Sequence, residues 1–361
     1  MNNSRPNQHT DEKVVITGIG LVTPVGLDSI MAPSSIWAGI TRFYEIPDFV
    51  TPKGAGSVGS IVKGITDARS GTDRMLSLAV PAAQEALFMA EEFYEDLDLP
   101  NSKLFLSMNP QERPVYEEFE EEDIQTFLDL IQAEGISSIE IIREGNAGGV
   151  LALLKSMALL KRGEMKACII GGVDSLVEYP SLAWLEEKER LKTDGRPNGL
   201  IPGEAAGFIV LELESTAEKR GAPILGEILG GAYTKEDADI FSDKPLLAKG
   251  LSESIRNTLE GAQMESNNLN GIICDLNGEN YRFKEWGIVQ SRVFDGSSPV
   301  PDLWHPAEYI GDIGAASFVV YIAIGVAGIK NKFFSGSNLL MWTSSDTGGR
   351  GSCLLTSYAK T

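Results

Sequence analysis

The order of apolar segments along the chain constrains its fold more than any other feature of the sequence. Short runs of β-branched and aliphatic residues alternate with longer helical stretches, which is typical of βαβ units. In the first half we predict strands and helices, in chain order, at 13–19, 75–94 (helix), 104–107, 139–142, 147–160 (helix), 167–171 and 206–212. In the second half the corresponding segments are 224–229, 246–263 (helix), 271–274, 313–329 (helix), 339–342 and 353–356. The same order therefore occurs twice, which indicates an ancient duplication.

The two halves divide the 361 residues shortly before the second round of strands begins. We expect an N-terminal half at 13–222 and a C-terminal half at 223–361, with one interface and one site between them. Residues 1–12 are polar and lack the apolar core of a signal peptide, so we expect a disordered tail on a cytoplasmic protein. His9 falls in this tail, where we expect it to be inert.

The composition is that of a globular protein with an acidic surface. Hydrophobic residues make up 43% of the chain and charged residues 23%. The formal net charge of -20 would repel nucleic acids and anionic membranes, and no basic stripe interrupted by aromatic residues offsets it. Both are therefore excluded as partners. The densest acidic run, Glu117–Asp123, is interpreted as a solvated helix face or a lid.

Neither the three cysteines nor the longest apolar stretch indicates secretion or membrane insertion. Three cysteines do not make a disulfide framework, and each lies in an apolar run that predicts a buried thiol: Cys168, Cys274 and Cys353. The stretch 313–329 is near the lower length limit for a membrane span and is rich in glycine and alanine. A helix buried on all sides fits it better. No CxxC, HExxH or P-loop motif occurs, and we expect neither metal nor cofactor.

Six segments match one known pattern in the correct order: Val14–Gly26, Trp37–Ile40, Lys161–Asp174, Leu200–Glu212, Gly314–Ala316 and Gly348–Gly349. They resemble, in turn, the opening strand, the next helix end, the strand after the nucleophile helix, the "GEGAG" strand, and the "GAAG" and "GFGG" turns of the β-ketoacyl-acyl-carrier-protein synthases. The segment between Gly54 and Asn101 is shorter than the family's cap. The resemblance implies an α/β fold of the thiolase-like type, in five αβαβα layers, and usually an intimate dimer.

The resemblance also implies a chemistry, Claisen condensation on a thioester. That reaction needs a nucleophile that holds the acyl chain and groups that stabilise an enolate and an oxyanion. The family uses a cysteine at the tip of a buried helix and two histidines on facing loops. Counting back from Arg162 places the cysteine position at Asn146, whose amide is no acyl acceptor. Asn146 is interpreted either as the N-cap of the helix at 147–160 or as an amide pointing into the former acyl site.

Both histidine positions are also changed. The "NAHGT" turn reads Asp275–Glu279 here, which puts the first histidine position at Asn277. The "GHxxGAAG" turn reads Ile310–Ala316 here, which puts the second at Gly311, and the family's lysine falls at about Pro306. The resemblance assigns to the acyl pocket Asn146, Glu204, Thr347 (the aromatic position of "GFGG"), Gly348 and Gly349. Glycines that carry the fold are kept while reactive side chains are lost, which indicates a scaffold without condensation.

His305 is the one remaining imidazole that lies near the site in sequence. A shifted loop would bring it into the site with Glu308 or Asp312 to orient it, whereas an isolated histidine beside proline and tryptophan is typical of packing. Cys274 is close in this register, but its strand is expected to bury it.

Three functions follow from these residues. The leading hypothesis is a non-condensing subunit that resembles chain-length factors and pairs with an active synthase, with acyl-carrier protein as a possible further partner. The second is an acyl-thioester enzyme that uses His305 for hydrolysis or acyl transfer. The third is a homodimeric acyl-ligand sensor or scaffold. For either kind of dimer the family's pairing strand is Ser138–Ile142, so Ile139 and Ile141 are the expected interface residues.

Overall fold

Two five-stranded units with the same strand order make up the sheet of this protein. The computed structural model describes residues 12–51, 54, 56–65, 70–91, 98–133, 135–294 and 301–360. The first unit has the order β5-β4-β6-β7-β1, made of Ser138–Ile142, Ser102–Ser107, Ala167–Ser175, Glu204–Leu213 and Val14–Val22. The second has the order β10-β9-β11-β12-β8, made of Leu303–Trp304, Gly271–Cys274, Leu339–Ser344, Gly349–Thr356 and Gly226–Lys235. The predicted duplication is confirmed, because strands at equivalent places in the two units have equivalent neighbours.

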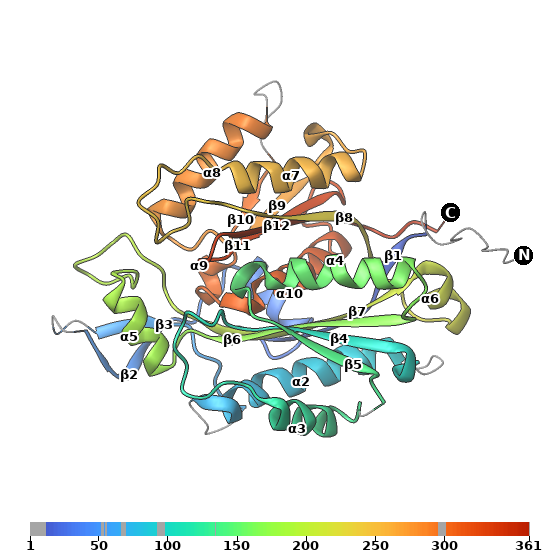
Figure 1. Cartoon of the computed structure of the whole chain (residues 1–361), viewed down its shortest axis with the longest axis horizontal. Coiled ribbons are helices and arrows are strands. Elements are labelled where there is room, and N and C mark those ends of the chain that lie inside the picture. Colours follow the sequence, from blue (N-terminus) through green and yellow to red (C-terminus); the bar gives the residue numbers. More distant parts are fainter. Residues whose placement is uncertain are drawn as a thin grey trace, which may run out of the picture.

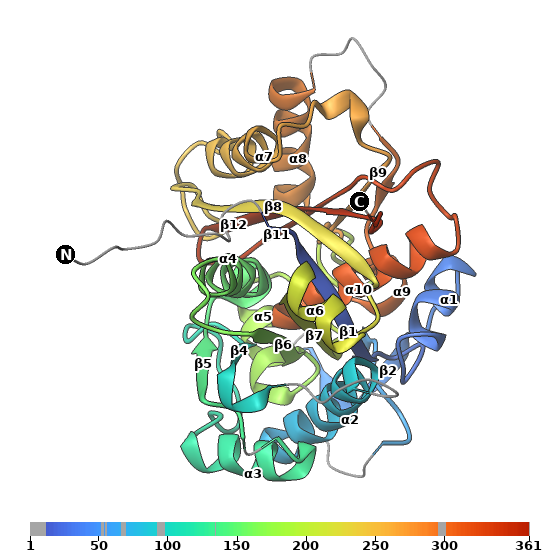
Figure 2. The same ribbon diagram turned by 90° about the vertical axis from the view of Figure 1, so that its right-hand side faces the viewer.

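The helices form three layers around the two units (Figure 1). α2 (Gly71–Glu91) and α3 (Glu121–Ile131) cover the outer face of the first unit, and α7 (Lys249–Gly261) and α8 (Asn280–Val293) cover that of the second. The remaining long helices, α4 and α10, lie between the units in both views (Figure 2) and span Gly148–Lys161 and Ser317–Lys330. The expected five αβαβα layers are therefore confirmed.

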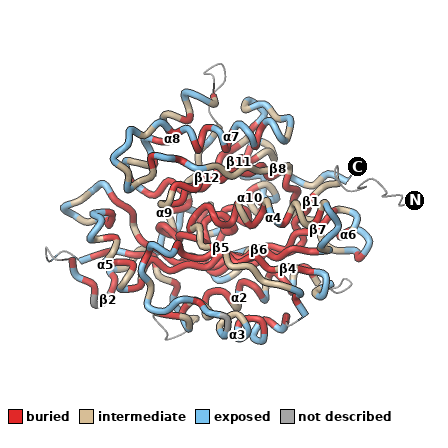
Figure 3. The backbone as a smooth tube through the Cα atoms, viewed as in Figure 1, coloured by how far each residue is buried: buried red, intermediate tan, exposed pale blue. Residues whose placement is uncertain are grey.

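In the central helix layer, α10 is among the most deeply buried parts of the molecule (Figure 3). α10 is buried along nearly its whole length, including Phe318 and Tyr321, and its residues join both units of the sheet in one hydrophobic core. This confirms the buried-helix interpretation of 313–329. Within the described residues, no helix combines the length and the hydropathy that crossing a membrane requires.

β1 shows why small residues are needed where a helix lies against a sheet. A Cβ atom on Gly20 would lie 1.9 Å from the carbonyl oxygen of Ala82 in α2, so only glycine permits this approach. Glu85 of the same helix accepts a hydrogen bond from the Leu21 amide at 2.9 Å. The two glycines of β1, Gly18 and Gly20, thus allow α2 to pack directly on the first unit.

Several elements were not predicted from the sequence. They are β2, β3, α3, α5, α6, α8, β10 and α9, at Tyr44–Val50, Gly56–Gly59, Glu121–Ile131, Tyr179–Glu187, Glu214–Arg220, Asn280–Val293, Leu303–Trp304 and Ala307–Ile310. The helix end expected at Trp37–Ile40 is that of α1 (Met31–Trp37). The acidic run is divided between a loop and the first turn of α3, and its Phe119 is buried. The expected tail, apart from Glu12, lies outside the described residues, as does His9.

Candidate functional site

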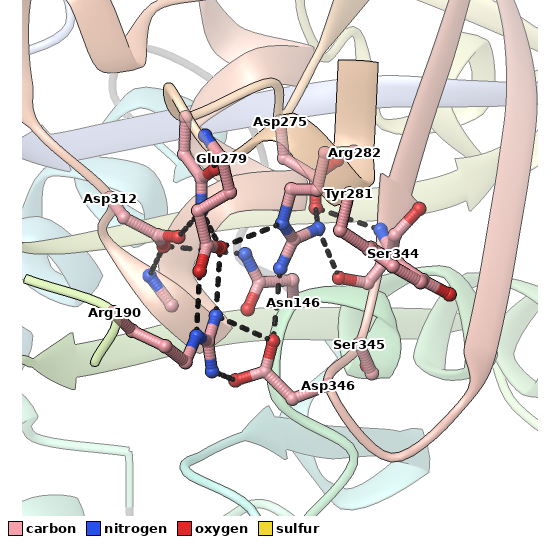
Figure 4. A network of polar contacts seen from close by, with 12 residues as sticks. Asn146, Arg190, Asp275, Glu279, Tyr281, Arg282, Asp312, Ser344, Ser345 and Asp346 are labelled. Carbon is pink, nitrogen blue, oxygen red and sulfur yellow. Dashed lines mark hydrogen bonds and ion pairs between the residues drawn. The ribbon is translucent and has the colours of Figure 1, made fainter. Parts of the chain in front are cut away.

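Four loops converge at the N-terminal tip of α4, between the two units (Figure 4). Asn146 lies in the short 3-10 turn η2 (Gly145–Ala147) that precedes α4. Its Nδ2 donates to Oδ1 of Asp312 at 3.4 Å, while Nδ2 of Asn277, from the loop after β9, donates to Oδ2 of Asp312 at 2.7 Å. The structure thus brings together Asn146 and Asn277 from opposite halves of the chain, on a single carboxylate.

Gly311 directly precedes Asp312 and completes this meeting point. Its φ of +71° belongs to the region that favours glycine. A Cβ atom there would lie 2.8 Å from the carbonyl oxygen of Ile201 and 3.0 Å from that of Pro202. The backbone at this position therefore accommodates no side chain without moving, and least of all an imidazole.

The interpretation of Asn146 as a helix cap is wrong. Neither η2 nor α4 has a side-chain hydrogen bond from its N-cap residue. Instead the Ala147 amide donates to Oγ of Ser345 at 3.0 Å, and the Ser345 hydroxyl donates to the carbonyl of Glu144. Because a serine from the β11–β12 turn satisfies the helix terminus, the amide of Asn146 is left to bind Asp312.

A closed ring of four charged side chains lies beside these amides (Figure 4). Arg190, from the segment after α5, donates to Glu279 through Nε and Nη2 at 2.7 and 2.8 Å, and to Asp346 through Nη1 and Nη2 at 2.6 and 3.0 Å. Arg282 of α8 reaches the same two carboxylates, at 3.1 Å to Asp346 and 3.6 Å to Glu279. We call these four residues the charged ring. Its cations and anions alternate, so its formal charges cancel.

The side chain of Asn277 joins the charged ring to Asp312, the carboxylate that Asn146 also binds. Asn277 Nδ2 donates to Oε2 of Glu279 at 2.9 Å as well as to Asp312. On the other side, Arg282 binds Oδ2 of Asp275 at 3.1 Å and the carbonyl of Ser344 at 2.6 Å. The polar groups at the tip of α4 are therefore one continuous network.

Burial raises the pKa values of the carboxyl groups in this network, and the neighbouring arginines lower them. Burial acts to raise the pKa of Asp346, but Arg190 and Arg282 outweigh it and hold the pKa at about 2. For Asp275 the effect of burial, which raises the pKa, exceeds that of Arg282, which lowers it, and the pKa is about 7. At neutral pH the carboxylate of Asp346 therefore stays ionised, whereas Asp275 takes up or releases a proton in this range.

None of the three cysteines supplies a reactive thiol. All three are free and buried. Burial raises the pKa of Cys168 to about 12 and raises the pKa values of Cys274 and Cys353 further above their ordinary range. The predicted burial is confirmed, and at neutral pH these thiols stay protonated.

His305 lies at the end of β10, where its contacts are with neighbours outside the charged ring. Its Nδ1 is 3.3 Å from Oε1 of Glu308, and its ring meets the edge of Phe283 at a centroid distance of 6.2 Å. Pro306, at the family's lysine position, begins α9 as its N-cap. Of the two carboxylates expected to orient this imidazole, Glu308 contacts it, but no contact of His305 with the network at the tip of α4 is seen among the described residues.

The other residues assigned to the acyl pocket lie in two places. Glu204 is fully buried at the start of β7, where it pairs with Arg74 and accepts hydrogen bonds from Ser175 at 2.9 Å and the Val62 amide at 2.8 Å. Thr347 and Gly348 lie in the β11–β12 turn directly after Asp346, and Gly349 begins β12. The turn therefore adjoins the charged ring, whereas the carboxylate of Glu204 belongs to a separate ion pair.

Sequence reasoning missed the charged ring. Two of its members carried a signal, because Glu279 stands at the threonine of "NAHGT" and Asp346 at the first glycine of "GFGG". A carboxylate in place of a small residue predicts a new partner nearby. Nothing around Arg190 or Arg282 in the sequence identifies them as those partners.

Fold and site together define a class. Two equivalent units, paired face to face over two buried helices, with loops from both units meeting at one helix tip, are the architecture of the thiolase-like ketosynthases. No family model matches the chain.

Comparison with known proteins agrees with this class. The chain is 22% identical over 293 residues to a 3-oxoacyl-[acyl-carrier-protein] synthase 2 of Staphylococcus aureus (strain N315), covering 71% of this chain and 70% of that protein. It is 26% identical over 313 residues to the chloroplastic 3-oxoacyl-[acyl-carrier-protein] synthase I of Arabidopsis thaliana, covering 74% and 66%.

Solved structures with the same fold cover nearly the whole chain. A ketosynthase in complex with its type II polyketide synthase acyl-carrier protein is similar with a TM-score of 0.82 at 17% identity, covering 96% of this chain and 100% of that one. The ishigamide ketosynthase/chain length factor is similar with a TM-score of 0.80 at 18% identity, covering 96% and 100%. This chain is a ketosynthase-like protein of thiolase-like fold, with 3-oxoacyl-[acyl-carrier-protein] synthases among its relatives.

Proposed function

We propose that this chain is a non-condensing ketosynthase-like subunit of fatty-acid or polyketide-type synthesis, and that it pairs with an active β-ketoacyl synthase. One observation carries the proposal. An ion-paired polar network fills the tip of α4, where the motifs of the family place the thiol and the two imidazoles.

The electrostatics of the network oppose condensation. An enolate and a tetrahedral oxyanion need hydrogen-bond donors aimed at developing negative charge. Here three carboxylates, those of Glu279, Asp312 and Asp346, occupy the neighbourhood instead. The one amide at a former histidine position, Asn277, already donates to two of them. The guanidinium groups of Arg190 and Arg282 are likewise bound to Glu279 and Asp346, so these donors already serve the carboxylates of the network rather than a developing oxyanion.

The edge of the first unit supports a paired assembly. β5 is the last strand of the sheet, and its outer edge has no neighbouring strand among the described residues. Ile139 and Ile141 are half-buried and pack toward the outer helix layer, while Glu140 is held by Lys155 and, at 2.8 Å, by Lys103. A strand edge without a neighbour favours pairing with a second strand. We propose that β5 forms the dimer interface, in a homodimer or in a heterodimer with the synthase.

Docking of an acyl-carrier protein is proposed for the partner rather than for this chain. Carrier proteins are acidic, and this chain carries a formal charge of -20. Two basic residues on and after α4 are already paired, Lys155 with Glu140 and Arg162 with Glu164. These two cations are therefore already engaged by carboxylates of this chain.

An acyl-thioester enzyme that uses His305 is the alternative proposal. The 3.3 Å contact with Glu308 favours it, because an oriented imidazole is what a general base requires. Against it, the polar network at the tip of α4 does not include this side chain. Turnover of acyl-carrier thioesters that is lost in His305→Ala, followed by mass spectrometry, would replace the leading proposal with this one.

Co-expression tests the partner directly. The chain is produced with an intact Cys-His-His synthase from the same source, and a tag on one subunit is used to recover the other. We expect a complex with one copy of each chain, measured by native mass spectrometry. Recovery of the tagged chain only as a homodimer, with the synthase left unbound, would contradict the heterodimer and leave a homodimeric acyl-binding scaffold as the remaining proposal.

A further inference from the structure

The guanidinium of Arg190 is bound on its edges and its faces. Glu279 and Asp346 each accept two hydrogen bonds from it, at 2.6–3.0 Å. The rings of Trp184 and Phe241 lie over it, with the guanidinium carbon 5.8 and 5.7 Å from their centroids. Arg190 is only 5% exposed. Paired bidentate carboxylates with aromatic faces are the arrangement that selects guanidinium over other cations.

The groups that hold Arg190 are positioned by contacts of their own. Glu279 accepts a hydrogen bond from Asn277 at 2.9 Å, and Asp346 accepts one from Arg282 at 3.1 Å. Phe241 comes from the connection between β8 and α7 and meets Trp184 of α5 in an edge-to-face contact at 5.6 Å. This side of the site is therefore built largely from parts of the chain far from Arg190.

Arg190 belongs to a segment, 188–200, that lies across the loop bearing Glu279. The segment is a tight hairpin, with Thr193 and Arg196 exchanging backbone hydrogen bonds at 3.0 Å. A further hydrogen bond joins the segment to the start of α8, where the Asn280 amide donates to Oδ1 of Asn198 at 2.7 Å. The side chain of Arg190 is thus the main polar attachment between this hairpin and the second unit.

We propose that Glu279, Asp346, Trp184 and Phe241 form a guanidinium-binding site, which Arg190 occupies from within the chain and which fastens the 188–200 hairpin across the second unit. The ligand class of this site is a guanidinium ion or a monosubstituted guanidine such as an arginine side chain. It follows that removal of the Arg190 side chain leaves a site that a guanidinium ion from solution fills. This inference does not depend on the proposed partner.

Chemical rescue of Arg190→Ala tests the site. The buried carboxylate of Glu279 and the partly buried one of Asp346 lose a partner, so we expect the thermal unfolding midpoint to fall by about 5–10 °C. Guanidinium chloride at tens of millimolar, far below denaturing concentrations, should restore about 2 °C or more of this loss along a saturating curve, because a ligand that binds only the folded state stabilises it. Sodium chloride and tetramethylammonium chloride at equal ionic strength should not.

Two matched proteins serve as controls. The unmodified chain keeps its site occupied and should show no saturable rise with guanidinium. Arg196→Ala removes a second arginine of the same hairpin, which pairs with Glu186 at 2.8 Å outside the site, and should also show none. The proposal would be overturned if sodium chloride raised the thermal unfolding midpoint of Arg190→Ala as much as guanidinium does, or if guanidinium raised that of Arg196→Ala in the same way.

Refolding covers the case in which Arg190→Ala does not accumulate as folded protein. The variant is then refolded from urea with and without guanidinium chloride at the same ionic strength, and the yield of folded protein is measured by near-UV circular dichroism. A yield that increases with guanidinium supports the site. An equal yield in both buffers, including no yield in either, counts against it.

Discussion

At the tip of α4, single side chains decide which chemistry the fold supports. Asn146 and Asn277 are neutral donors, and both are used to bind Asp312. Gly311 holds a backbone conformation that leaves no room for a side chain beside the carbonyl of Ile201. A substitution at Asn146 or Asn277 therefore removes a hydrogen bond to Asp312, and one at Gly311 forces the backbone to move.

Gly311→Ala tests this at one position. The φ of +71° and the 2.8 Å approach to the Ile201 carbonyl both disfavour a Cβ atom, so we expect a loss of about 2–4 kcal/mol in the free energy of unfolding. Denaturant titration measures it. Gly287→Ala in α8 is the matched control, since open space surrounds that position and alanine favours a helix; we expect no loss there. Equal effects of the two substitutions would contradict the steric argument.

Glu178 gives a prediction for pH. Its carboxylate accepts a hydrogen bond from the Gly71 amide at 2.8 Å, and burial raises its pKa to about 7. A carboxyl whose pKa is raised on folding binds more protons in the folded state, so its contribution to stability falls as the pH rises from about 4.5 to 7. The variant Glu178→Gln lacks this titrating group. From pH 4.5 to pH 8, its free energy of unfolding minus that of the parent should therefore increase by on the order of 1–2 kcal/mol.

The measurement for Glu178 is the free energy of unfolding of both proteins at several pH values. Glu187→Gln, whose side chain is 72% exposed, should show no such trend. A difference between Glu178→Gln and the parent that stays constant with pH would mean that this carboxyl titrates at its ordinary pKa in the folded protein.

Among the secondary-structure elements, the apolar strands and the two central helices were predictable and several surface helices were not. α10 is apolar along its whole length, so it was visible in the sequence. α8 was missed because the residues it buries include Arg282 and Glu285, which a search for an apolar stripe counts as exposed. Its burial depends on partners such as Arg350, which binds Glu285 at 2.8 Å from another element.

The edge strand β5 gives a prediction at this scale. Ile141→Lys places a charge on the half-buried face of the strand, so we expect a monomer or insoluble protein instead of a dimer. Sedimentation velocity measures the assembly. Leu130→Lys, at a position of α3 that is 48% exposed, should leave the assembly unchanged. An unchanged dimer in Ile141→Lys would contradict the proposed interface.

For the molecule as a whole, the duplicated order of segments predicted two equivalent halves and the family resemblance implied the five layers, but neither predicted the charged ring. Arg190 pairs with Glu279 and Asp346 across 89 and 156 residues of sequence. Only the folded arrangement of the two units brings these groups together, and a single sequence contains no pattern that links them. Convergence of the positions now held by Asn146 and Asn277 was predictable because family motifs specify it.

We propose that this chain forms no acyl-enzyme and catalyses no condensation. The most direct measurement is the intact mass of the purified chain after incubation with acyl and malonyl thioesters of an acyl-carrier protein, with release of carbon dioxide followed in parallel. We expect the mass of this chain to be unchanged and no carbon dioxide to be released, while an intact Cys-His-His synthase in the same assay gains the acyl group. A covalent acyl adduct on any residue of this chain, or carbon dioxide released by it alone, would contradict the account.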